Sequence, residues 1–480
     1  MIGRQKRWQE DLFVAGPLCD LIPDDHILKQ VDRVLDLSWL RGEVREGYDE
    51  SQGRPSVDPE AALRLMLAGF FLGVVHDRKL MREAQVNLAI RWFAGYRLHE
   101  TLPNHSSLTR IRQRWGADVF HRIFKRTVAA CAQAGLVDGD TVHVDATLIR
   151  ADVSWESLST TYAEKVMAAN ANGDDDPDGH APPKRGRPRT KPAQPKKRST
   201  TDPDATLTTS SKHERMEPCY KQHTAADDKA GVIVDVAVTA GEASEGVQLS
   251  EQIDRIESNT GTAIETVTCD AGYAHAKNYA MLEARGISSV IPPQPQPKRP
   301  RHIPVRRFKY DARYQRVICP QGRVLRGSYS NDAGRFFRAS THDCRACPLR
   351  ERCFSVSAKS RSVLIVHGYE ALLRARRWHQ RWDERTRRWY RRHRWRVEGV
   401  HGEAKTQHGL RRAARRGLDN VAIQAYLTAA VMNLKRLAAF ACAVRMRPCG
   451  FTRPLDSRQR ILHLGGAAHR RARESVKRAA

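Results

Sequence analysis

The sequence predicts a mixed α/β protein in which helices come first, strands follow, and helices close the chain. Three observations favour this fold class. Apolar residues repeat at helical spacing through residues 1–135, alternate with polar residues at several points between 141 and 293, and return to helical spacing through 366–440. The 480 residues are enough for about two to four domains.

Residues 1–135 are predicted to form an N-terminal helical domain. Asp58 is suited to cap a helix at its N-terminus, and Pro59 suits the first helical position. A further helical pattern covers residues 79–93.

A third helix of this domain is predicted to begin near "NHSSLTRIRQRW", with Ser106 or Ser107 as its N-terminal cap. It carries Arg110 and Arg112, which we expect to contact DNA. Two helices joined by a proline-containing turn, the second of them basic, are typical of a helix-turn-helix reader. A helical bundle with a solvated basic face has the same pattern, and the sequence leaves both interpretations open.

Residues 136–300 are predicted to contain strands at 141–149, 231–239 and 264–273, then a helix at 276–286 and one more apolar stretch. The first strand, "TVHVDATLI", alternates as a half-buried strand does, and His143 and Asp145 share its polar face. Asp270 ends the third strand, just before a turn that contains glycine.

Within this region, residues 168–212 are predicted to be a disordered basic linker, because they are polar, proline-rich and arranged in blocks of charge. The linker includes "KRGRPR", whose Arg185 and Arg187 resemble the core of an AT-hook, a segment that enters narrow minor grooves. A plain basic linker without a DNA-binding role would have the same composition.

Residues 301–365 are predicted to be a β-rich insertion with four cysteines. The pair Cys344 and Cys347 has the spacing of half a tetrahedral zinc site, which Cys319 and Cys353 would complete. Iron–sulfur ligation and four unliganded thiols remain open as alternatives.

Residues 366–440 are predicted to form the closing helices, the first of them a single helix that ends at Gly409, followed by a basic tail at 441–480. A helical wheel places Arg394, Glu398, His401 and Lys405 on one narrow face and Glu403 on the opposite side. Taken alone, Arg394 and Glu398 would be an ordinary ion pair between helical neighbours.

The charge of the chain indicates a polyanionic partner. Its 82 lysines and arginines exceed its 54 aspartates and glutamates by 28, and its pI is near 10.1. This balance favours nucleic acid first and an anionic membrane surface second. The apolar run Leu63–Val75 is too short to span a bilayer and the N-terminus lacks a secretory pattern, so we expect a cytoplasmic, nucleoid-associated protein with no membrane contact and reduced cysteines.

Three carboxylates stand out in this basic chain: Asp145, Asp270 and Glu398. Carboxylates at two strands and a helix favour a site for metal-dependent phosphoryl transfer, since Mg²⁺ prefers oxygen ligands. Two such ions about 3.5–4 Å apart can hold the attacking and leaving oxygens of a displacement at phosphorus.

At these motifs the chain resembles the DDE transposases of bacterial insertion sequences. The stretches that carry the resemblance are "GRPSVDPEAALRLMLAGFFLG" with "LPNHSSLTRIRQR", "VHVDATLIRADVS", "VTCDAGYAHAKNYAML" and the long segment that begins "RWRVEGVHGEAKTQHG". Arg394, Glu398 and Lys405 have the spacing of the family's third motif. The family's tyrosine usually precedes that arginine by three residues, whereas Tyr390 precedes Arg394 by four.

The resemblance implies a ribonuclease H-like core in which Asp145, Asp270 and Glu398 bind two Mg²⁺ or Mn²⁺ ions. It also implies that Arg394 and Lys405 contact phosphates at the transposon end. The expected partner is double-stranded DNA, at terminal inverted repeats and at a target, and the expected assembly is a homodimer in the synaptic complex. The expected activity is DNA cleavage followed by strand transfer. The alternative is a catalytically idle, transposase-derived DNA-binding protein.

Overall fold

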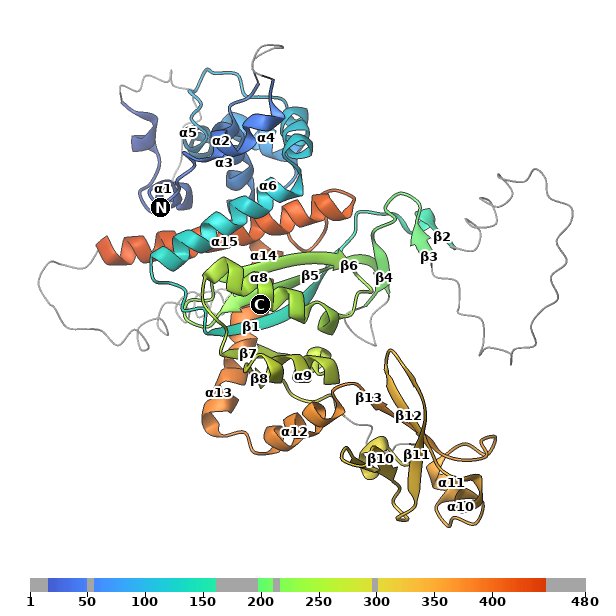
Figure 1. The fold of residues 1–480 in the computed structure, drawn as a ribbon. Helices are drawn as coiled ribbons and strands as arrows, with labels where there is room; N and C mark the ends of the chain where they lie inside the picture. The colour runs from blue at the N-terminus through green and yellow to red at the C-terminus, as the bar shows by residue number, and fades with distance from the viewer. Residues whose placement is uncertain (1–15, 50–55, 161–196, 210–215, 296–300, 446–480) are drawn as a thin grey trace, which may run out of the picture. The chain divides into compact units, whose positions relative to one another are not determined.

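The computed structural model describes residues 16–49, 56–160, 197–209, 216–295 and 301–445 (Figure 1). It is a mixed α/β structure, and the chain divides into two units. Unit 1 comprises residues 1–136, 149–220 and 402–480, and unit 2 comprises 137–148 and 221–401.

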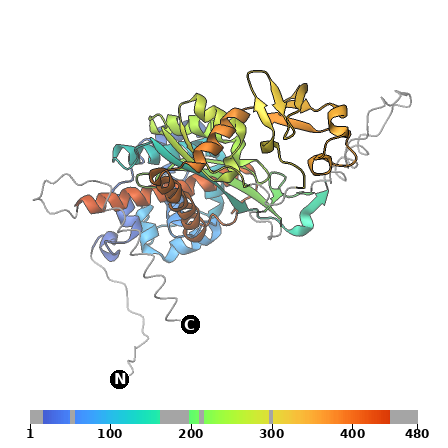
Figure 2. The ribbon, with the colours of Figure 1, turned by 90° about the horizontal axis from the view of Figure 1, so that it is seen from below.

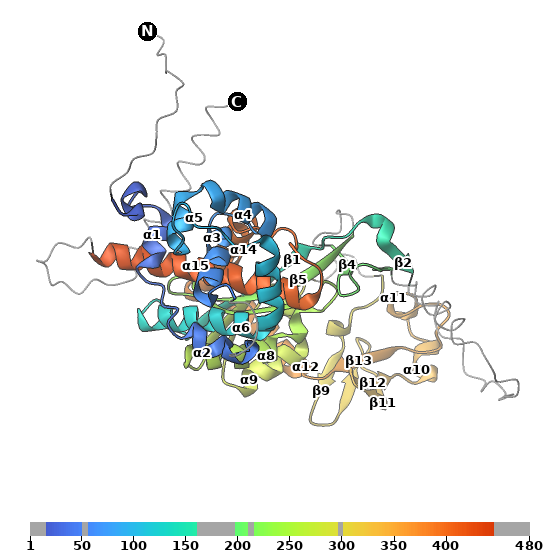
Figure 3. The ribbon, with the colours of Figure 1, turned by 90° about the horizontal axis from the view of Figure 1, so that it is seen from above.

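Unit 1 is built around helices from both ends of the chain. Helix α15 packs along α6, and α1 and α3 also contact α15 (Figures 1 and 3). Apolar side chains of these helices form one buried cluster that runs from Ile22 to Ala438. The helices are α1 (Ile27–Asp32), α2 (Leu40–Val44), α3 (Pro59–Phe71), α4 (Asp77–Val86), α5 (Leu88–Phe93), α6 (His105–Gln133) and α15 (Leu418–Arg445).

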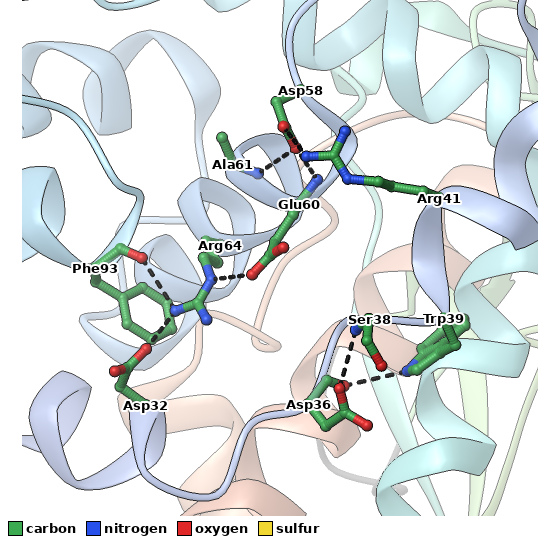
Figure 4. Close-up of polar contacts among 10 residues, drawn as sticks. All are labelled: Asp32, Asp36, Ser38, Trp39, Arg41, Asp58, Glu60, Ala61, Arg64 and Phe93. Carbon is green, nitrogen blue, oxygen red and sulfur yellow. Dashed lines mark hydrogen bonds and ion pairs between the residues drawn. The ribbon is translucent and has the colours of Figure 1, made fainter.

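The start of α3 is as predicted. Asp58 caps the helix by accepting a hydrogen bond from the backbone N–H of Glu60 at 2.7 Å (Figure 4). One turn on, Arg64 binds Glu60 at 3.0 Å, Asp32 at 2.5 Å and the carbonyl oxygen of Phe93 at 3.2 Å (Figure 4). A single guanidinium therefore ties α3 to α1 and α5.

Helix α6 is capped two or three residues earlier than predicted. Asn104, not Ser106 or Ser107, caps it, and its side chain accepts from the N–H of Ser106 at 3.0 Å. At Gly116 the backbone takes a left-handed φ of 67°, which breaks the helical geometry inside α6.

Helix α15 is long and apolar enough to cross a membrane by length and composition alone. The same description fits a core helix of a globular domain, and α15 packs into the apolar cluster of unit 1, with residues such as Leu427 and Val431 fully buried. Its length is therefore explained by packing within the protein.

The main sheet of unit 2 has the strand order β6-β5-β1-β7-β8. Strand β1 pairs in parallel with β7, and β7 in parallel with β8. Helices α8 (Leu249–Thr260) and α9 (Ala276–Ala284) belong to the same unit. The strands are β1 (Thr141–Arg150), β5 (Glu217–Asp227), β6 (Ile233–Ala240), β7 (Thr266–Cys269) and β8 (Ser288–Val290); the ends of β1 and β5 extend into unit 1.

Two features of this sheet depart from the sequence analysis. Strand β5 was not expected, and its buried residues include Gln222, His223 and Thr224, which do not read as an apolar strand. Strand β1 was expected to be half-buried, but its first four residues, Thr141–Val144, are all buried. A strand with a neighbour on each side and covered faces buries polar residues as well.

The prediction of a disordered linker at 168–212 is wrong for its described part. Residues 197–208 contain strands β3 (Lys197–Ser199) and β4 (Thr206–Thr208), with β3 paired to β2 (Leu158–Thr160). The "KRGRPR" segment, with Arg185 and Arg187, lies outside the described residues.

The predicted β-rich insertion is a five-stranded antiparallel sheet with its own buried cluster, drawn in yellow to orange in Figure 2. The strand order is β13-β12-β11-β10-β9, and two short helices, α10 (Thr341–Arg345) and α11 (Arg350–Cys353), follow β12. The strands are β9 (Lys309–Asp311), β10 (Arg316–Ile318), β11 (Val324–Asn331), β12 (Gly334–Arg338) and β13 (Ser362–Val366).

The closing helices are interrupted, whereas the sequence analysis expected one helix ending at Gly409. Helix α12 (Tyr369–Gln380) stops before Asp383, which caps α13 (Glu384–His393) by accepting from the N–H of Thr386 at 2.8 Å. A π-helical turn, Arg394–Glu398, then leads into α14 (Gly399–Gln407).

Candidate active site

Two of the predicted carboxylates lie on neighbouring strands of unit 2: Asp145 is in the middle of β1, and Asp270 directly follows β7. Strands β1 and β7 are parallel, with Val144 opposite Cys269, so Asp145 and Asp270 each follow a paired residue. Asp270 caps the short turn after β7, and its Oδ1 accepts from the N–H of Gly272 at 2.8 Å. Parallel pairing is thus what brings together two acids 125 positions apart in the chain.

The two carboxylates affect one another's charge. Burial, the negative charge of Asp145 and that of Glu245 raise the pKa of Asp270 to about 6. Burial opposes the ionisation of Asp145 as well, but the imidazole of His401, 3.6 Å away, holds the pKa of that carboxyl below its ordinary value. One acid of the pair is therefore stabilised as a carboxylate, and the other lacks a compensating positive charge.

Glu398 lies at the end of the π-helical turn and its side chain is 57% exposed. Its Oε2 accepts from Nε of Arg394 at 3.0 Å, as the helical wheel predicted. All three predicted carboxylates lie within electrostatic range of Tyr390: burial raises the pKa of this phenol, and the charges of Asp270, Glu398 and Asp145 raise it further.

These acids are close without forming a ready-made ligand cage. Within the described ranges, no three His, Cys, Asp or Glu side chains are arranged to hold a metal ion. Asp145 and Asp270 come from the sheet, while Glu398 is turned toward Arg394. The structure therefore brings the first two acids together and leaves the third beside them.

The π-helical turn bears on the unusual position of Tyr390. A π turn accommodates one residue more than an α-helical turn and is frequently found at functional sites. Tyr390 precedes Arg394 by one residue more than the usual spacing, and the wide turn begins at Arg394 itself. Tyr390 stacks on His393, with centroids 6.1 Å apart, and remains near the carboxylates despite the extra residue.

A buried chain of hydrogen bonds connects the sheet to the helix that precedes Glu398. Nε2 of His143 contacts Oδ1 of Asp228 at 2.9 Å, and its Nδ1 contacts Oγ1 of Thr268 at 2.6 Å. The same hydroxyl contacts Nδ1 of His393 at 2.9 Å. Strands β1 and β7 are thereby joined to α13 through groups that are almost entirely buried.

The direction of these bonds follows from the charges. Burial opposes the ionisation of Asp228, but His143 and Arg392 hold its pKa below the usual range, while burial lowers the pKa of His143 and brings that of His393 to about 4. Neutral His143 then donates from Nε2 to Asp228 and accepts from the Thr268 hydroxyl, which itself accepts from Nδ1–H of His393. His143 is therefore a hydrogen-bonded core residue.

Glu245 is an acid near the site that the sequence analysis missed. It follows β6, and its Oε1 lies 3.2 Å from Nζ of Lys221 on β5. A side chain at Gly272 would place its Cβ 2.6 Å from Oε2 of Glu245 and 2.9 Å from Oδ1 of Asp270. The glycine after "CDA" thus leaves room for two carboxylates, a signal that could have pointed to a second acid.

The four cysteines of the insertion gather in space. Cys344 and Cys353 belong to its buried cluster, against which Cys319 packs. Burial raises the pKa of Cys353, and the neighbouring Cys344, Cys347 and Cys319 raise it further. The described thiols are free, and they do not form a metal-ligand arrangement as they stand.

The predicted DNA contacts have different surroundings. Arg110 is exposed on α6, and Lys405 is half-buried on α14. Arg112 is 3% exposed and donates two hydrogen bonds to Asp77, at 2.7 and 2.8 Å. The prediction that Arg112 contacts DNA is therefore wrong for this structure, because its guanidinium is used to hold α6 against α4.

Two family models match the chain. One, described as a transposase domain (DUF772), matches residues 17–114, and the other, described as a transposase DDE domain, matches residues 318–438. No curated protein matches. The second match includes Arg394, Glu398 and Lys405, whereas Asp145 and Asp270 lie outside both ranges.

A helical transposase domain followed by a DDE domain defines an enzyme that acts on DNA by metal-dependent polynucleotidyl transfer. The chain is a DDE transposase of an insertion sequence, as its motifs suggested.

Proposed function

We propose that the chain binds the terminal inverted repeats of its insertion sequence, cleaves DNA there and transfers the freed strand to a target, with Asp145, Asp270 and Glu398 as the catalytic residues. The observation that carries this proposal is the pair of partly buried aspartates, Asp145 and Asp270, which directly follow the paired residues Val144 of β1 and Cys269 of β7. A basic chain of net charge +28 suits the DNA substrate.

The core of unit 2 is, in this proposal, ribonuclease H-like. Its support is the sheet order β6-β5-β1-β7-β8, with two parallel pairings on one side of β1. Asp145 lies within the central strand β1, Asp270 follows β7, and the π-helical turn Arg394–Glu398 supplies the third acid. The five-stranded insertion then lies between the second aspartate and Glu398 in the chain.

The residues fit a divalent cation such as Mg²⁺ or Mn²⁺. Asp145 and Asp270 offer hard oxygen donors, and the raised pKa of Asp270 is the mark of a carboxylate short of positive charge. Asp145, Asp270 and Glu398 would hold two ions. Bound there, the ions would supply Lewis acidity toward a phosphodiester. His401 orients Asp145, and Arg394 orients Glu398 through the hydrogen bond from its Nε.

The remaining assignments follow the same proposal. Arg394 and Lys405 contact phosphates at the transposon end, and exposed Arg110 contributes to DNA binding by the helical domain. Two copies meet in the synaptic complex, in the cytoplasm and close to the nucleoid. Cys319, Cys344, Cys347 and Cys353 hold a structural zinc ion, a role favoured by their proximity. Metal analysis of the purified protein should give about one zinc per chain, and the Cys344→Ser variant should lose it.

The direct test uses Asp270→Ala with Glu265→Ala as its matched control, because Glu265 is an exposed acid at the opposite end of the same strand. Asp270→Ala should retain binding to terminal-repeat DNA and lose Mg²⁺-dependent cleavage, while Glu265→Ala should keep both. Full cleavage by Asp270→Ala would remove this residue from the mechanism. An unaltered chain that binds repeats but never cleaves them would favour the catalytically idle DNA-binding alternative.

A further inference from the structure

One face of the insertion sheet points away from its buried cluster. Alternate residues of β12 face opposite sides, and Phe337 is fully buried in the cluster. Phe336 and Arg338 therefore lie on the outer face. Cross-strand pairing adds their partners to that face: Tyr329 and Arg326 from β11, and Leu364 and Ser362 from β13.

The outer face carries an exposed aromatic pair. Tyr329 and Phe336 are directly opposed, and their rings are stacked with centroids 4.4 Å apart and planes 14° from parallel. Tyr329 is 56% exposed, and Leu364 beside Phe336 is only half-buried. A stacked aromatic pair at the surface of a sheet leaves a ring face open to a further planar group.

Beside this pair, two arginines are directly opposed. Arg326 pairs with Arg338, and both are exposed. Like charges at opposed positions destabilise a sheet. Neither guanidinium has an ion-pair partner among the residues that the structure describes, and strands β11, β12 and β13 contain no acidic residue. The positive charges of Arg326 and Arg338 are therefore not balanced by an acidic residue of these strands.

The whole insertion has the same character. Residues 303–366 contain 14 lysines and arginines against 4 aspartates and glutamates, a net charge of +10. Opposed arginines attract phosphate oxygens, and an adjacent aromatic ring attracts the face of a base. Base faces are covered by their neighbours within a duplex and are open in an unpaired strand, so the two features together select single-stranded nucleic acid.

We propose that the outer face of the insertion sheet binds unpaired nucleotides of a DNA strand, with bases on Tyr329 and Phe336 and backbone phosphates on Arg326 and Arg338. The inference deepens the proposed transposase function and rests on it for the identity of the strand: DNA unpaired near a cleavage point. The site lies on the insertion and uses none of the three catalytic carboxylates.

The test measures binding of the full chain to a labelled single-stranded oligonucleotide and to a blunt duplex, by fluorescence anisotropy in EDTA. Tyr329→Ala should weaken single-strand binding roughly 5- to 100-fold and duplex binding less than about 2-fold, given the usual contribution of one stacked base. Tyr329→Phe should bind like the unaltered chain, since it keeps the ring. Tyr314→Ala is the matched control, because Tyr314 is equally exposed but lies in the turn between β9 and β10.

The arginines provide a second measurement. Arg326→Ala should lower the salt dependence of single-strand binding by about 0.7 in the slope of log K against log salt. It should leave the melting temperature unchanged or raise it, because it removes a repulsion. Arg313→Ala, which removes an exposed arginine outside this face, should change neither the melting temperature nor the preference for single strands.

Several results would overturn the inference. They are unchanged single-strand binding in a Tyr329→Ala, Phe336→Ala double variant, an equal loss in Tyr314→Ala, or a change only in the oligomeric mass of the chain. Because EDTA removes divalent ions, a failure of the catalytic site leaves the measurement intact. Absence of binding to any DNA would contradict the proposed function itself, whereas normal duplex binding without single-strand binding would contradict only this inference.

Discussion

Two acids, Asp270 in unit 2 and Glu403 in unit 1, have opposite electrostatic surroundings. Asp270 faces Asp145 and Glu245, and together with burial they raise its pKa to about 6. Burial opposes the ionisation of Glu403 too, but His408, Arg436 and Lys435 lower its pKa to about 2.

The difference separates a structural acid from a candidate ligand. Glu403 has its counter-charges within the protein: Nζ of Lys435 is 2.5 Å from its Oε1 and Nε2 of His408 is 3.5 Å away. Asp270 has a backbone N–H and two negative neighbours. A carboxylate with negatively charged neighbours is stabilised by a bound cation, and this is the condition expected of a metal ligand.

The largest expected effect is on catalysis. Asp145→Asn should reduce Mg²⁺-dependent cleavage by at least about 10³-fold, since charge stabilisation by a bound metal contributes several kcal/mol. Isothermal titration with Mn²⁺ should show weakened binding in the same variant. Glu403→Gln serves as the control and should bind Mn²⁺ normally. Equal Mn²⁺ affinities in the unaltered chain, Asp145→Asn and Glu403→Gln would contradict the distinction between a metal-binding acid and a structural acid.

The second effect is on stability. Glu403→Gln should lower the free energy of unfolding at pH 7 by about 3 kcal/mol, which corresponds to the difference between an ordinary pKa of 4.5 and a folded value of about 2. The side chain is 25% exposed, so screening reduces this figure only in part. Denaturant unfolding of the two proteins measures the difference.

The direction of the Glu403 pKa shift fixes how this stability difference depends on pH. Because folding depresses the pKa of Glu403, its contribution is complete above pH 4.5 and is lost as the pH falls toward 2. The stability gap between the unaltered chain and Glu403→Gln should therefore close over this range. A gap that stays constant from pH 7 to pH 2 would mean that packing, and not charge, accounts for the effect.

A third effect tests how the acids of the sheet are held near the closing helix. Thr268→Val removes the hydroxyl shared by His143 and His393 with little change of shape, and should lower the free energy of unfolding by about 2 kcal/mol, at about 1 kcal/mol per lost bond. Thr266→Val is the control, since Thr266 is buried on the same face of β7. If both variants lose the same stability, the hydrogen-bond chain contributes nothing specific.

Much of this arrangement could be predicted from the sequence, because helix caps, strand alternation and helical ion pairs depend on residues that are close together in the chain. Asp58 before Pro59 predicted the start of α3, and the alternation around Asp145 predicted β1. The face shared by Arg394 and Glu398 was also correct, and its ion pair is present at 3.0 Å.

What could not be predicted depends on long-range packing. Strand β5 is paired on both sides, and its buried polar residues erase the alternation by which a strand is recognised. Arg112 looked like a DNA contact because its partner Asp77 is 35 positions away in the sequence. The break between α12 and α13 depends on Asp383 acting as a cap within an arginine-rich run. Glu245 is notable only once β6 and β7 are known to share a sheet.

The smallest expected effect on stability concerns the ion pair that faces solvent. Arg394 and Glu398 are 79% and 57% exposed, and an exposed pair one helical turn apart contributes only about 0.3–0.5 kcal/mol. The free energy of unfolding of Arg394→Ala should therefore lie within about 0.5 kcal/mol of that of the unaltered chain. Its affinity for terminal-repeat DNA should fall, and the slope of log K against log salt should shrink by about 0.9, the loss of one phosphate contact.

Arg374→Ala is the matched control for this last comparison, because Arg374 also forms an exposed ion pair, at 2.6 Å from Glu283, but on α12. It should keep the full salt slope. If the two variants have the same salt slope, Arg394 contributes to DNA binding only as one positive charge among many. If Arg394→Ala instead loses more than about 1 kcal/mol of stability, its pair with Glu398 belongs with the buried, structural charges such as that of Glu403.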